Sequence, residues 1–427
     1  METIFALSTA PGKAGVAVMR VSGPEVPAVA ETLCGGLPAP RCASLRVLRG
    51  QDGERIDEAL ILYFPEKASF TGEAVLELQT HGSPAVIAAL FRELGNIPCL
   101  RMAEPGEFSR RALGNGRMDL TQVEALADLL DAETDAQRRQ AVRVQSGQLG
   151  VLCAEWRQAL VRAAALLEVT IDFADEEVPV DVTPEVRALL GGVMADLRGQ
   201  IAGARAAERV RSGFEVAIVG VPNVGKSTLL NRLAGRDAAI TSEHAGTTRD
   251  VIEVRMDLDG LPVTVLDTAG LRETSDAVET IGIARARERA EAADLRVFLI
   301  EGEEQFDDLR QPGDLAYRAK ADMVGEPGGI SGLTGAGIED LIASITAILR
   351  ERAQSVGMAI RARHAAAMCK GLASLEEVVA FLDAGDAATD LAAENLHAAI
   401  RALDSLVGRV DVEAVLGEIF ASFCLGK

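Results

Sequence analysis

The sequence predicts a multidomain α/β protein, with an N-terminal α+β domain, an all-α helical domain and an α/β domain inserted into the helical one. Three observations indicate this class. Short β-branched runs such as Gly15–Val21 and Ala74–Leu78, separated by glycine and proline, fill the first part of the chain. Apolar residues recur at helical spacing from Thr121 onward, and an apolar strand at Phe214 runs into a glycine loop.

The composition is that of a folded, acidic protein. The chain has 427 residues, of which 64 are acidic and 43 are basic, and its formal net charge is −21. That length suffices for about three domains of roughly 150 residues each. The negative charge argues against broad, non-specific binding to nucleic acid, because lysine and arginine supply the affinity for phosphate backbones.

Cysteine usage and hydropathy exclude further classes. The six cysteines are scattered without a CxxC pair, so we expect neither a disulfide framework nor a zinc site. The chain contains no run of 18 apolar residues, and its first residues lack the basic and apolar regions of a signal peptide. We therefore expect a soluble cytoplasmic protein that does not bind a membrane.

The helical pattern is interrupted once. Residues 121–124 match a capping box, which predicts a helix that begins at Thr121, and residues 181–184 mark another helix start. Apolar residues between 391 and 406 resume the helical spacing. Because a compact α/β unit with adjacent termini can be inserted into another fold, we predict one helical domain split by an insertion. The predicted segments are residues 1–118, 119–210, 211–350 and 351–427.

Residues 220–227 match the GxxxxGK[ST] pattern of a phosphate-binding loop. They follow the apolar strand Phe214–Val219 and precede a predicted helix at 228–233, so both contextual conditions of the motif are met. In such a loop, backbone N–H groups and the helix N-terminus cradle phosphates. We expect Lys226 to reach the β- and γ-phosphates and the Ser227 hydroxyl to bind Mg²⁺.

Two further segments match motifs that act together with a phosphate-binding loop. The apolar run Val263–Leu266 predicts a strand that ends in residues 267–270, Asp-Thr-Ala-Gly, which place an acidic Mg²⁺ partner before a glycine that senses the γ-phosphate. Between the two lie residues 246–250, Gly-Thr-Thr-Arg-Asp, where a threonine hydroxyl would complete the Mg²⁺ shell. In this order and spacing the three motifs resemble those of the translation-factor-like GTPases, which implies that the inserted domain is Ras-like and binds GTP.

Guanine recognition is predicted at residues 319–322, Ala-Lys-Ala-Asp, and 331–333, Ser-Gly-Leu. Asp322 would accept hydrogen bonds from the guanine N1–H and amino groups, and Lys320 would pack along the ring. The usual motif begins with asparagine, and the missing amide of Ala319 should weaken base binding, because one hydrogen bond contributes about 0.5–1.5 kcal/mol. Asp322 disfavours ATP as the ligand, but Ala319 leaves an ATPase open as an alternative.

The water-orienting glutamine of the best-known GTPases is absent. Leu271 stands at its position after the Asp-Thr-Ala-Gly segment, so another cation and another base are needed. Asn223 offers an oxygen near the β/γ bridge where a monovalent cation such as K⁺ would replace an arginine finger. Glu273 and Glu279 are the candidate bases.

These motifs resemble the MnmE/TrmE family of GTPases that modify the wobble uridine of bacterial tRNA. The flanking domains extend the resemblance over essentially the whole chain. The further matching segments are an RxSGP motif at 20–24, a Leu-Glu-Leu-Gln-x-His-Gly segment at 76–82, the stretch 104–125 and a Cys-Leu-Gly-Lys tail at 424–427.

The resemblance implies a K⁺-activated GTPase whose G domains dimerise across the nucleotide face. It places Glu279 on the residue that positions the attacking water and Arg272 in the same switch segment. The implied metal ligands are Ser227 and Thr248 for Mg²⁺, and Asn223, Ser242, His244 and Thr247 for K⁺. The implied GTP-binding residues are Asn223, Val224, Gly225, Lys226, Ser227, Thr228, Ser242, Glu243, His244, Ala245, Gly246, Thr247, Thr248, Asp267, Thr268, Ala269, Gly270, Lys320, Asp322, Ser331, Gly332 and Leu333.

The N-terminal domain of the family binds a tetrahydrofolate derivative between two subunits, in the 5-formyl or 5,10-methylene form, which implies a homodimer here. Arg20, Glu77 and Arg117 match its folate-contacting positions, and Lys427 belongs to the tail that reaches toward the folate. A carboxylate suits the amide-and-amine edge of a pterin, and arginines suit the glutamate tail. Cys424 is implied in the modification reaction, although a lone cysteine is more often a small buried hydrophobe.

The resemblance implies GTP hydrolysis coupled to the addition of an aminomethyl or carboxymethylaminomethyl group at C5 of the wobble uridine, together with an FAD-binding partner protein. A GTP-switched assembly factor without further chemistry is the alternative, and the folate-like domain and Cys424 disfavour it. Arginines at 138–143 and 285–289 are candidate tRNA contacts, although such clusters are more often solvated faces paired with acids. The sequence leaves open which tRNAs are modified and whether glycine or ammonium is the second substrate.

Overall fold

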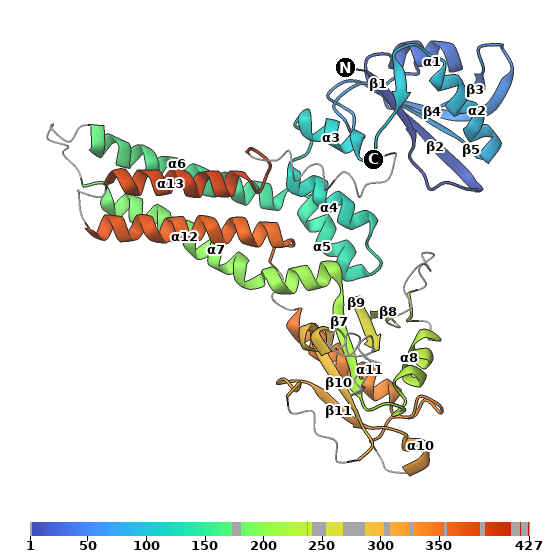
Figure 1. Cartoon of the computed structure of the whole chain (residues 1–427). Helices are drawn as coiled ribbons and strands as arrows, with labels where there is room; N and C mark the ends of the chain where they lie inside the picture. Colours follow the sequence, from blue (N-terminus) through green and yellow to red (C-terminus); the bar gives the residue numbers. More distant parts are fainter. Residues whose placement is uncertain are drawn as a thin grey trace, which may run out of the picture. The chain divides into compact units, whose positions relative to one another are not determined.

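The computed structural model divides into two compact units, Met1–Ala127 with Asp404–Lys427, and Asp128–Leu403 (Figure 1). None of the described helices is long and apolar enough to cross a membrane. The division into four segments at residues 118, 210 and 350 stays a prediction. The structure describes residues 2–172, 181–236, 238–240, 253–267, 287–302, 308–324, 328–353, 357–384, 389–410, 419 and 426.

A six-stranded sheet of order β3-β4-β5-β2-β1-β6 forms the N-terminal α+β domain. Ala59 and Ile61 belong to its buried core, whereas Leu60 between them is exposed, so helices cover one face of the sheet. The strands predicted at 15–21 and 74–78 are confirmed as β2 and β5. The elements are β1 Thr3–Leu7, β2 Ala14–Ser22, α1 Val26–Cys34, β3 Ser44–Arg49, β4 Arg55–Phe64, β5 Val75–Gly82, α2 Pro84–Gly95, β6 Leu100–Met102 and α3 Glu107–Gly114.

The predicted start of the next helix at Thr121 is wrong by one residue, because α4 spans Leu120–Leu130. Asp119 caps it, since its carboxylate accepts hydrogen bonds from the Gln122 N–H at 2.9 Å and the Thr121 hydroxyl at 2.7 Å. The Gln122 amide oxygen accepts from the Asp119 N–H at 3.0 Å, which completes a reciprocal pair. Thr121 itself is fully buried.

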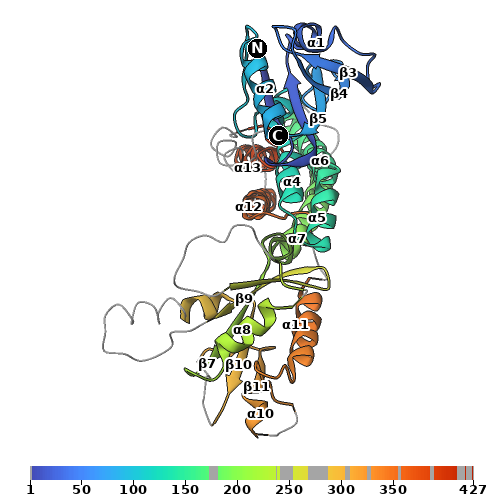
Figure 2. The same cartoon turned by 90° about the vertical axis from the view of Figure 1, so that its right-hand side faces the viewer.

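Helices from both sides of the insertion pack together. Helices α6 and α7 lie beside α12 and α13 in both views (Figures 1 and 2). Arg187 of α7 pairs with Asp383 of α12 at 2.6 Å, and His397 of α13 lies 3.1 Å from Glu168 of α6. The helix start expected at residues 181–184 is confirmed by α7, and the helical spacing expected between 391 and 406 is confirmed by α13, which ends at Asp404. The helices are α5 Asp135–Gln145, α6 Gln148–Asp172, α7 Thr183–Ser212, α12 Ala362–Ala384 and α13 Thr389–Asp404.

The inserted domain is a five-stranded sheet of order β11-β10-β7-β9-β8, parallel except for β8. Its central strands are buried almost throughout, as expected for a parallel sheet covered on both faces. The predicted strands at 214 and 263 and the helix at 228 are confirmed. The elements are β7 Phe214–Gly220, α8 Lys226–Ala234, β8 Glu253–Leu258, β9 Leu261–Asp267, β10 Leu295–Ile300, β11 Leu315–Arg318, α10 Ala321–Val324 and α11 Ile338–Arg352.

A buried arginine in β10 connects this sheet to the loops on either side of the strand. Arg296 of β10 is 1% exposed and forms an ion pair of 2.7 Å with Asp314. It also donates hydrogen bonds to the Ala293 carbonyl at 3.1 Å and the Gln311 side chain at 2.9 Å. Every contact of this guanidinium that the structure describes is internal to the domain, so Arg296 is part of the scaffold.

Truncation of Arg296 should destabilise the inserted domain. Arg296→Ala leaves Asp314 buried without its partner, and we expect a loss of about 3–5 kcal/mol in the free energy of unfolding. Chemical denaturation of the full chain measures it. Arg287→Ala, which removes the exposed pairs with Glu291 and Asp308, is the matched control and should cost at most about 1 kcal/mol. Equal losses in the two variants would contradict the assignment.

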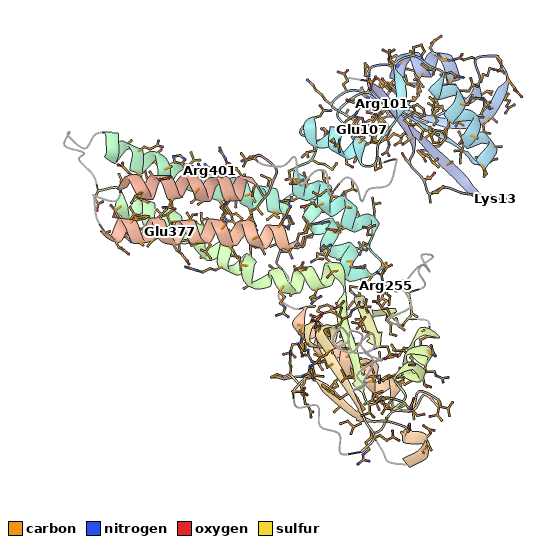
Figure 3. All side chains as sticks on the ribbon, in the orientation of Figure 1. Lys13, Arg101, Glu107, Arg255, Glu377 and Arg401 are labelled. Carbon is orange, nitrogen blue, oxygen red and sulfur yellow. The ribbon has the colours of Figure 1, made fainter. Side chains whose placement is uncertain are left out.

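Helix α3 begins at a buried carboxylate. Glu107 accepts hydrogen bonds from Arg101 at 2.7 and 2.8 Å, from Arg111 at 2.9 Å and from the Glu104 N–H at 3.0 Å; Figure 3 labels Arg101 and Glu107. Burial alone would raise the pKa of Glu107, but the hydrogen bonds from Arg101, the Glu104 N–H and Arg111 outweigh burial and bring it to about 2.

Acid should therefore weaken the N-terminal unit through Glu107. The stabilisation is complete above the ordinary carboxyl pKa of 4.5 and is lost as the pH falls toward 2, because the folded-state pKa is the lower one. We expect Glu107→Gln to lower the free energy of unfolding by up to about 3 kcal/mol at pH 7 and by less at pH 3. Denaturation at several pH values measures the difference. Glu58→Gln, at an exposed position of β4, should show no such trend.

Candidate functional site

The phosphate-binding loop joins β7 to α8 in a conformation that requires glycine. A Cβ at Gly220 would lie 2.8 Å from the Leu299 carbonyl oxygen, which leaves no room for a side chain. Gly225 has φ 110° and Asn223 has φ 62°, both in the left-handed region. Left-handed residues in such a loop direct successive N–H groups to one side, which forms an anion-binding concavity.

Lys226 lies under this loop and is 7% exposed. Its Nζ donates hydrogen bonds to the carbonyls of Gly220 at 2.7 Å and Val221 at 3.1 Å. Burial lowers the pKa of Lys226, and the nearby carboxylate of Asp267 partly opposes this effect. The carbonyls of Gly220 and Val221 thus hold the ammonium group against the loop that the motif assigns to phosphate binding.

Ser227 in the first turn of α8 contacts Asp267 at the end of β9. The Ser227 hydroxyl donates to Asp267 Oδ2 at 2.9 Å, and Asp267 ends β9 at only 5% exposure. Its other oxygen, Oδ1, is buried and has no hydrogen-bond partner within the described residues. A buried carboxylate oxygen without a partner is costly, so it marks a place for a water molecule or a cation. A hydroxyl and a carboxylate are the oxygen ligands that suit Mg²⁺.

A cavity of about 270 Å³ adjoins the loop. The structure brings together predicted residues from both ends of the inserted domain, about 100 positions apart, to line it. Ala319 and Met323 also line it, together with Leu229, Leu299 and Ile330. The predicted residues that line it are Asn223, Val224, Gly225, Thr228, Lys320, Asp322, Ser331, Gly332 and Leu333.

The two loops of this cavity are held closely. Gly332 packs on the first turn of α8, since a Cβ there would lie 2.7 Å from the Leu229 nitrogen. Lys320 has φ 54°, which is unusual for a residue with a side chain, and its Nζ pairs with Glu301 at 2.9 Å. Lys320 and Asn223 thus place two strained backbone positions at one cavity, a pattern common at binding sites.

The structure has a larger cavity elsewhere, of about 460 Å³, lined by residues such as Glu133, Arg211 and Arg255. It includes none of the residues of the phosphate loop. The smaller cavity is the candidate site because the motif residues converge there. Several predicted residues fall outside the described part of the chain, namely Ser242, Glu243, His244, Ala245, Gly246, Thr247, Thr248, Thr268, Ala269, Gly270, Arg272, Glu273, Glu279, Cys424 and Lys427.

In the N-terminal unit, Arg20 and Glu77 form an ion pair across β2 and β5. Arg20 Nη2 and Nε lie 2.8 and 3.0 Å from Glu77 Oε1, and both side chains are 17% exposed. The guanidinium also lies 5.5 Å from the centre of the Phe70 ring and 5.8 Å from that of Phe108. The two rings were not predicted, because an apolar residue in a motif has no chemical signature of binding.

The end of the chain reaches this ion pair. The Gly426 carbonyl accepts hydrogen bonds from Arg20 Nη1 at 3.3 Å and the Ser8 hydroxyl at 3.1 Å. A Cβ on Gly426 would collide with the Leu7 carbonyl, so only glycine fits there. Arg20, Glu77 and the tail are therefore brought together. Arg117 is exposed and lies against the turn at Gly72, and no contact with Arg20 or Glu77 is described for it.

Four of the arginines in the two candidate tRNA-contact clusters pair with acids. Arg138 and Arg139 each lie 2.6 Å from Asp135. In the second cluster, Arg287 lies 3.1 Å from Glu291 and Arg289 lies 2.6 Å from Glu253, whereas Arg285 lies outside the described residues. Pairing at a spacing of three or four residues, as for Arg138, Arg139 and Arg287, is typical of a solvated helix face, which was the alternative expected for these residues.

Two family models together match almost the whole chain. Residues 3–117 match the family model described as GTP-binding protein TrmE N-terminus, and residues 120–424 match the MnmE helical domain. The tRNA modification GTPase MnmE of Roseobacter denitrificans is 58% identical over 430 residues, and that of Ruegeria pomeroyi is 59% identical over 428. Each alignment covers 100% of both chains.

Among solved structures, Era from Aquifex aeolicus bound to GDP and AlF₄⁻ matches 31% of this chain and 56% of its own, at 29% identity and a TM-score of 0.26. Both MnmE relatives align over their full length at more than 50% identity, so every segment of this chain is included in the similarity. The chain therefore belongs to the MnmE family of tRNA modification GTPases.

Proposed function

We propose that this protein hydrolyses GTP to GDP and phosphate as part of tRNA modification. The observation that carries the proposal is the convergence of Lys226, Ser227 and Asp267 beside the cavity that Asp322 lines. The residues proposed to bind phosphate, Mg²⁺ and the base therefore converge on one site. The membership of the chain in a family named for this activity supports the same reaction.

Each residue of the site has its own role in the proposed hydrolysis. Lys226 exchanges the loop carbonyls for phosphate oxygens, and the loop N–H groups bind the remaining oxygens. Ser227 and Thr248 would hold Mg²⁺, with the Asp267 carboxylate beside Ser227, and the ion would neutralise charge that develops on the phosphates. Glu279 positions the attacking water, and Arg272 orders the same segment.

A K⁺ ion supplies the charge that an arginine finger supplies elsewhere. Leu271 cannot orient water and no finger is predicted, so hydrolysis needs another cation. Asn223, in the loop that lines the cavity, is the side chain best placed by sequence to hold it. Ser242, His244 and Thr247 complete the ligand set in this proposal.

The N-terminal domain serves the modification reaction. Arg20 and Glu77 hold a tetrahydrofolate derivative, with Arg117 and Lys427 as further contacts, and the folate supplies the methylene carbon. Cys424 acts in the same reaction. The protein works as a cytoplasmic homodimer with an FAD-binding partner protein and adds an aminomethyl or carboxymethylaminomethyl group at C5 of the tRNA wobble uridine. A purely regulatory GTPase would not need the Arg20–Glu77 site.

Hydrolysis should depend on K⁺ through Asn223. We expect GTP turnover at least about 10-fold faster in KCl than in NaCl at matched ionic strength, with ATP inert, because the cation replaces an arginine finger. Phosphate release by the purified chain measures it. Asn223→Ala should remove the advantage of K⁺, whereas Asn231→Ala, at an exposed position of α8, should keep it. Turnover indifferent to the cation would contradict the K⁺ site.

Folate binding should depend on the Arg20–Glu77 pair. We expect Arg20→Ala and Glu77→Gln each to weaken binding of 5-formyltetrahydrofolate by about 10-fold or more, since each removes a charge-assisted hydrogen bond. Calorimetric titration of the full chain measures it, and GTP turnover should stay unchanged. Glu58→Gln on the neighbouring strand is the control. Unaltered folate affinity in both variants would remove this pair from the proposal.

A further inference from the structure

We infer that the nucleotide cavity recognises guanine through its N1, N2 and O6 atoms and does not recognise N7, because residue 319 is alanine. The inference rests on the proposed GTP site and specifies how that site selects its base. It predicts tolerance for purine nucleotides altered at position 7 that keep the guanine pairing edge.

Ala319 contributes only a methyl group to the cavity. It lies just after β11, is 4% exposed and lines the wall beside Leu299 and Ile330. Its N–H donates to the Ile300 carbonyl at 2.8 Å, and it bridges to Ile330 in the neighbouring loop. Neither its side chain nor its N–H is therefore available to a base.

The cavity offers two kinds of polar group to a base. One is the carboxylate of Asp322, which accepts hydrogen bonds. The other is the pair of N–H groups of Gly332 and Leu333, for which no hydrogen-bond partner is found among the residues that the structure describes. The neighbouring N–H groups are committed, since Ser331 donates to Ala336 at 3.0 Å and Thr334 to the Ser331 hydroxyl at 3.2 Å.

The remaining side chains that line the cavity form apolar surface or belong to the phosphate-binding region. Lys320 pairs with Glu301, so its aliphatic stem faces the cavity as an apolar surface. Leu333 and Met323 are 73% and 78% exposed at the rim, where they can cover the faces of a ring. Asn223 and Thr228 belong to the phosphate loop and the first turn of α8.

These groups match one edge of guanine. Guanine donates from N1 and N2 and accepts at O6 and N7, whereas adenine donates from its N6 amine and accepts at N7. Asp322 satisfies both guanine donors, and the loop N–H groups satisfy O6. Adenine would set its N1 lone pair against the carboxylate, so selection against it persists. An asparagine at position 319 would add an amide donor to the same wall, and alanine leaves N7 without one.

The test is competition binding to the full chain. Fluorescently labelled GDP is displaced by GDP, 7-deaza-GDP, IDP and ADP. We expect 7-deaza-GDP to bind within about 2-fold of GDP, IDP about 10-fold more weakly because it lacks the N2 amine, and ADP at least about 100-fold more weakly. In Ala319→Asn, GDP should gain about 3-fold to 10-fold over 7-deaza-GDP.

Ala316→Asn is the matched control, because it makes the same change on β11 at an exposed position outside the cavity. It should leave all ratios unchanged, with thermal unfolding as the check on folding. A loss of more than about 5-fold for 7-deaza-GDP in the natural chain would overturn the inference, as would a folded Ala319→Asn variant without the gain. Failure of GDP itself to bind would instead reject the proposed GTP site, and the inference with it.

Discussion

The parallel pairing of β7 with β9 is the constraint on which the nucleotide site depends. It sets Ile218 opposite Asp267, so the phosphate loop and the carboxylate leave the sheet at the same edge. The pairing of β7 with β10 on the other side brings Leu299 against Gly220, which leaves room only for glycine. The 2.9 Å contact of Ser227 with Asp267 is a consequence of this strand order.

The buried charged groups of the scaffold differ from Asp267 at the candidate site in how completely they are paired. Arg296 and Asp314 satisfy one another inside the inserted domain, and Glu107 collects donors from two arginines and the backbone. Asp267 differs, because one of its buried oxygens has no partner in the described chain. A fold bears the cost of such an atom only where something outside the fold completes it. The unpartnered oxygen of Asp267 therefore supports the ligand site that the motif predicts.

The N-terminal unit prepares its site in another way. Arg20 is fixed by Glu77, by the Gly426 carbonyl and by two aromatic rings, so its guanidinium loses little freedom when a ligand binds. Around it, Ser22 donates to Glu73 at 2.8 Å, and Glu73 pairs with Arg111 at 3.0 Å. The motif residues of this domain thus include both ligand candidates and the charges that support them.

Local patterns determined much of this protein from sequence alone. The strand, loop and helix from Phe214 to Ala234 follow from a buried run, two required glycines and a helix start, all within reach of one another along the chain. The cap of α4 was mistaken because Asp119 and Thr121 are both good capping residues. The hydrogen bonds decide between them, since the Asp119 carboxylate accepts from the Gln122 N–H and from the Thr121 hydroxyl. The resemblance already grouped Asn223 with Asp322 and the tail with the folate site. The tertiary structure alone decided that Arg296 meets Asp314 and that the Gly426 carbonyl accepts a hydrogen bond from Arg20. Those partners lie between 18 and 406 residues apart, and strand order and core packing, which no local pattern encodes, bring them together.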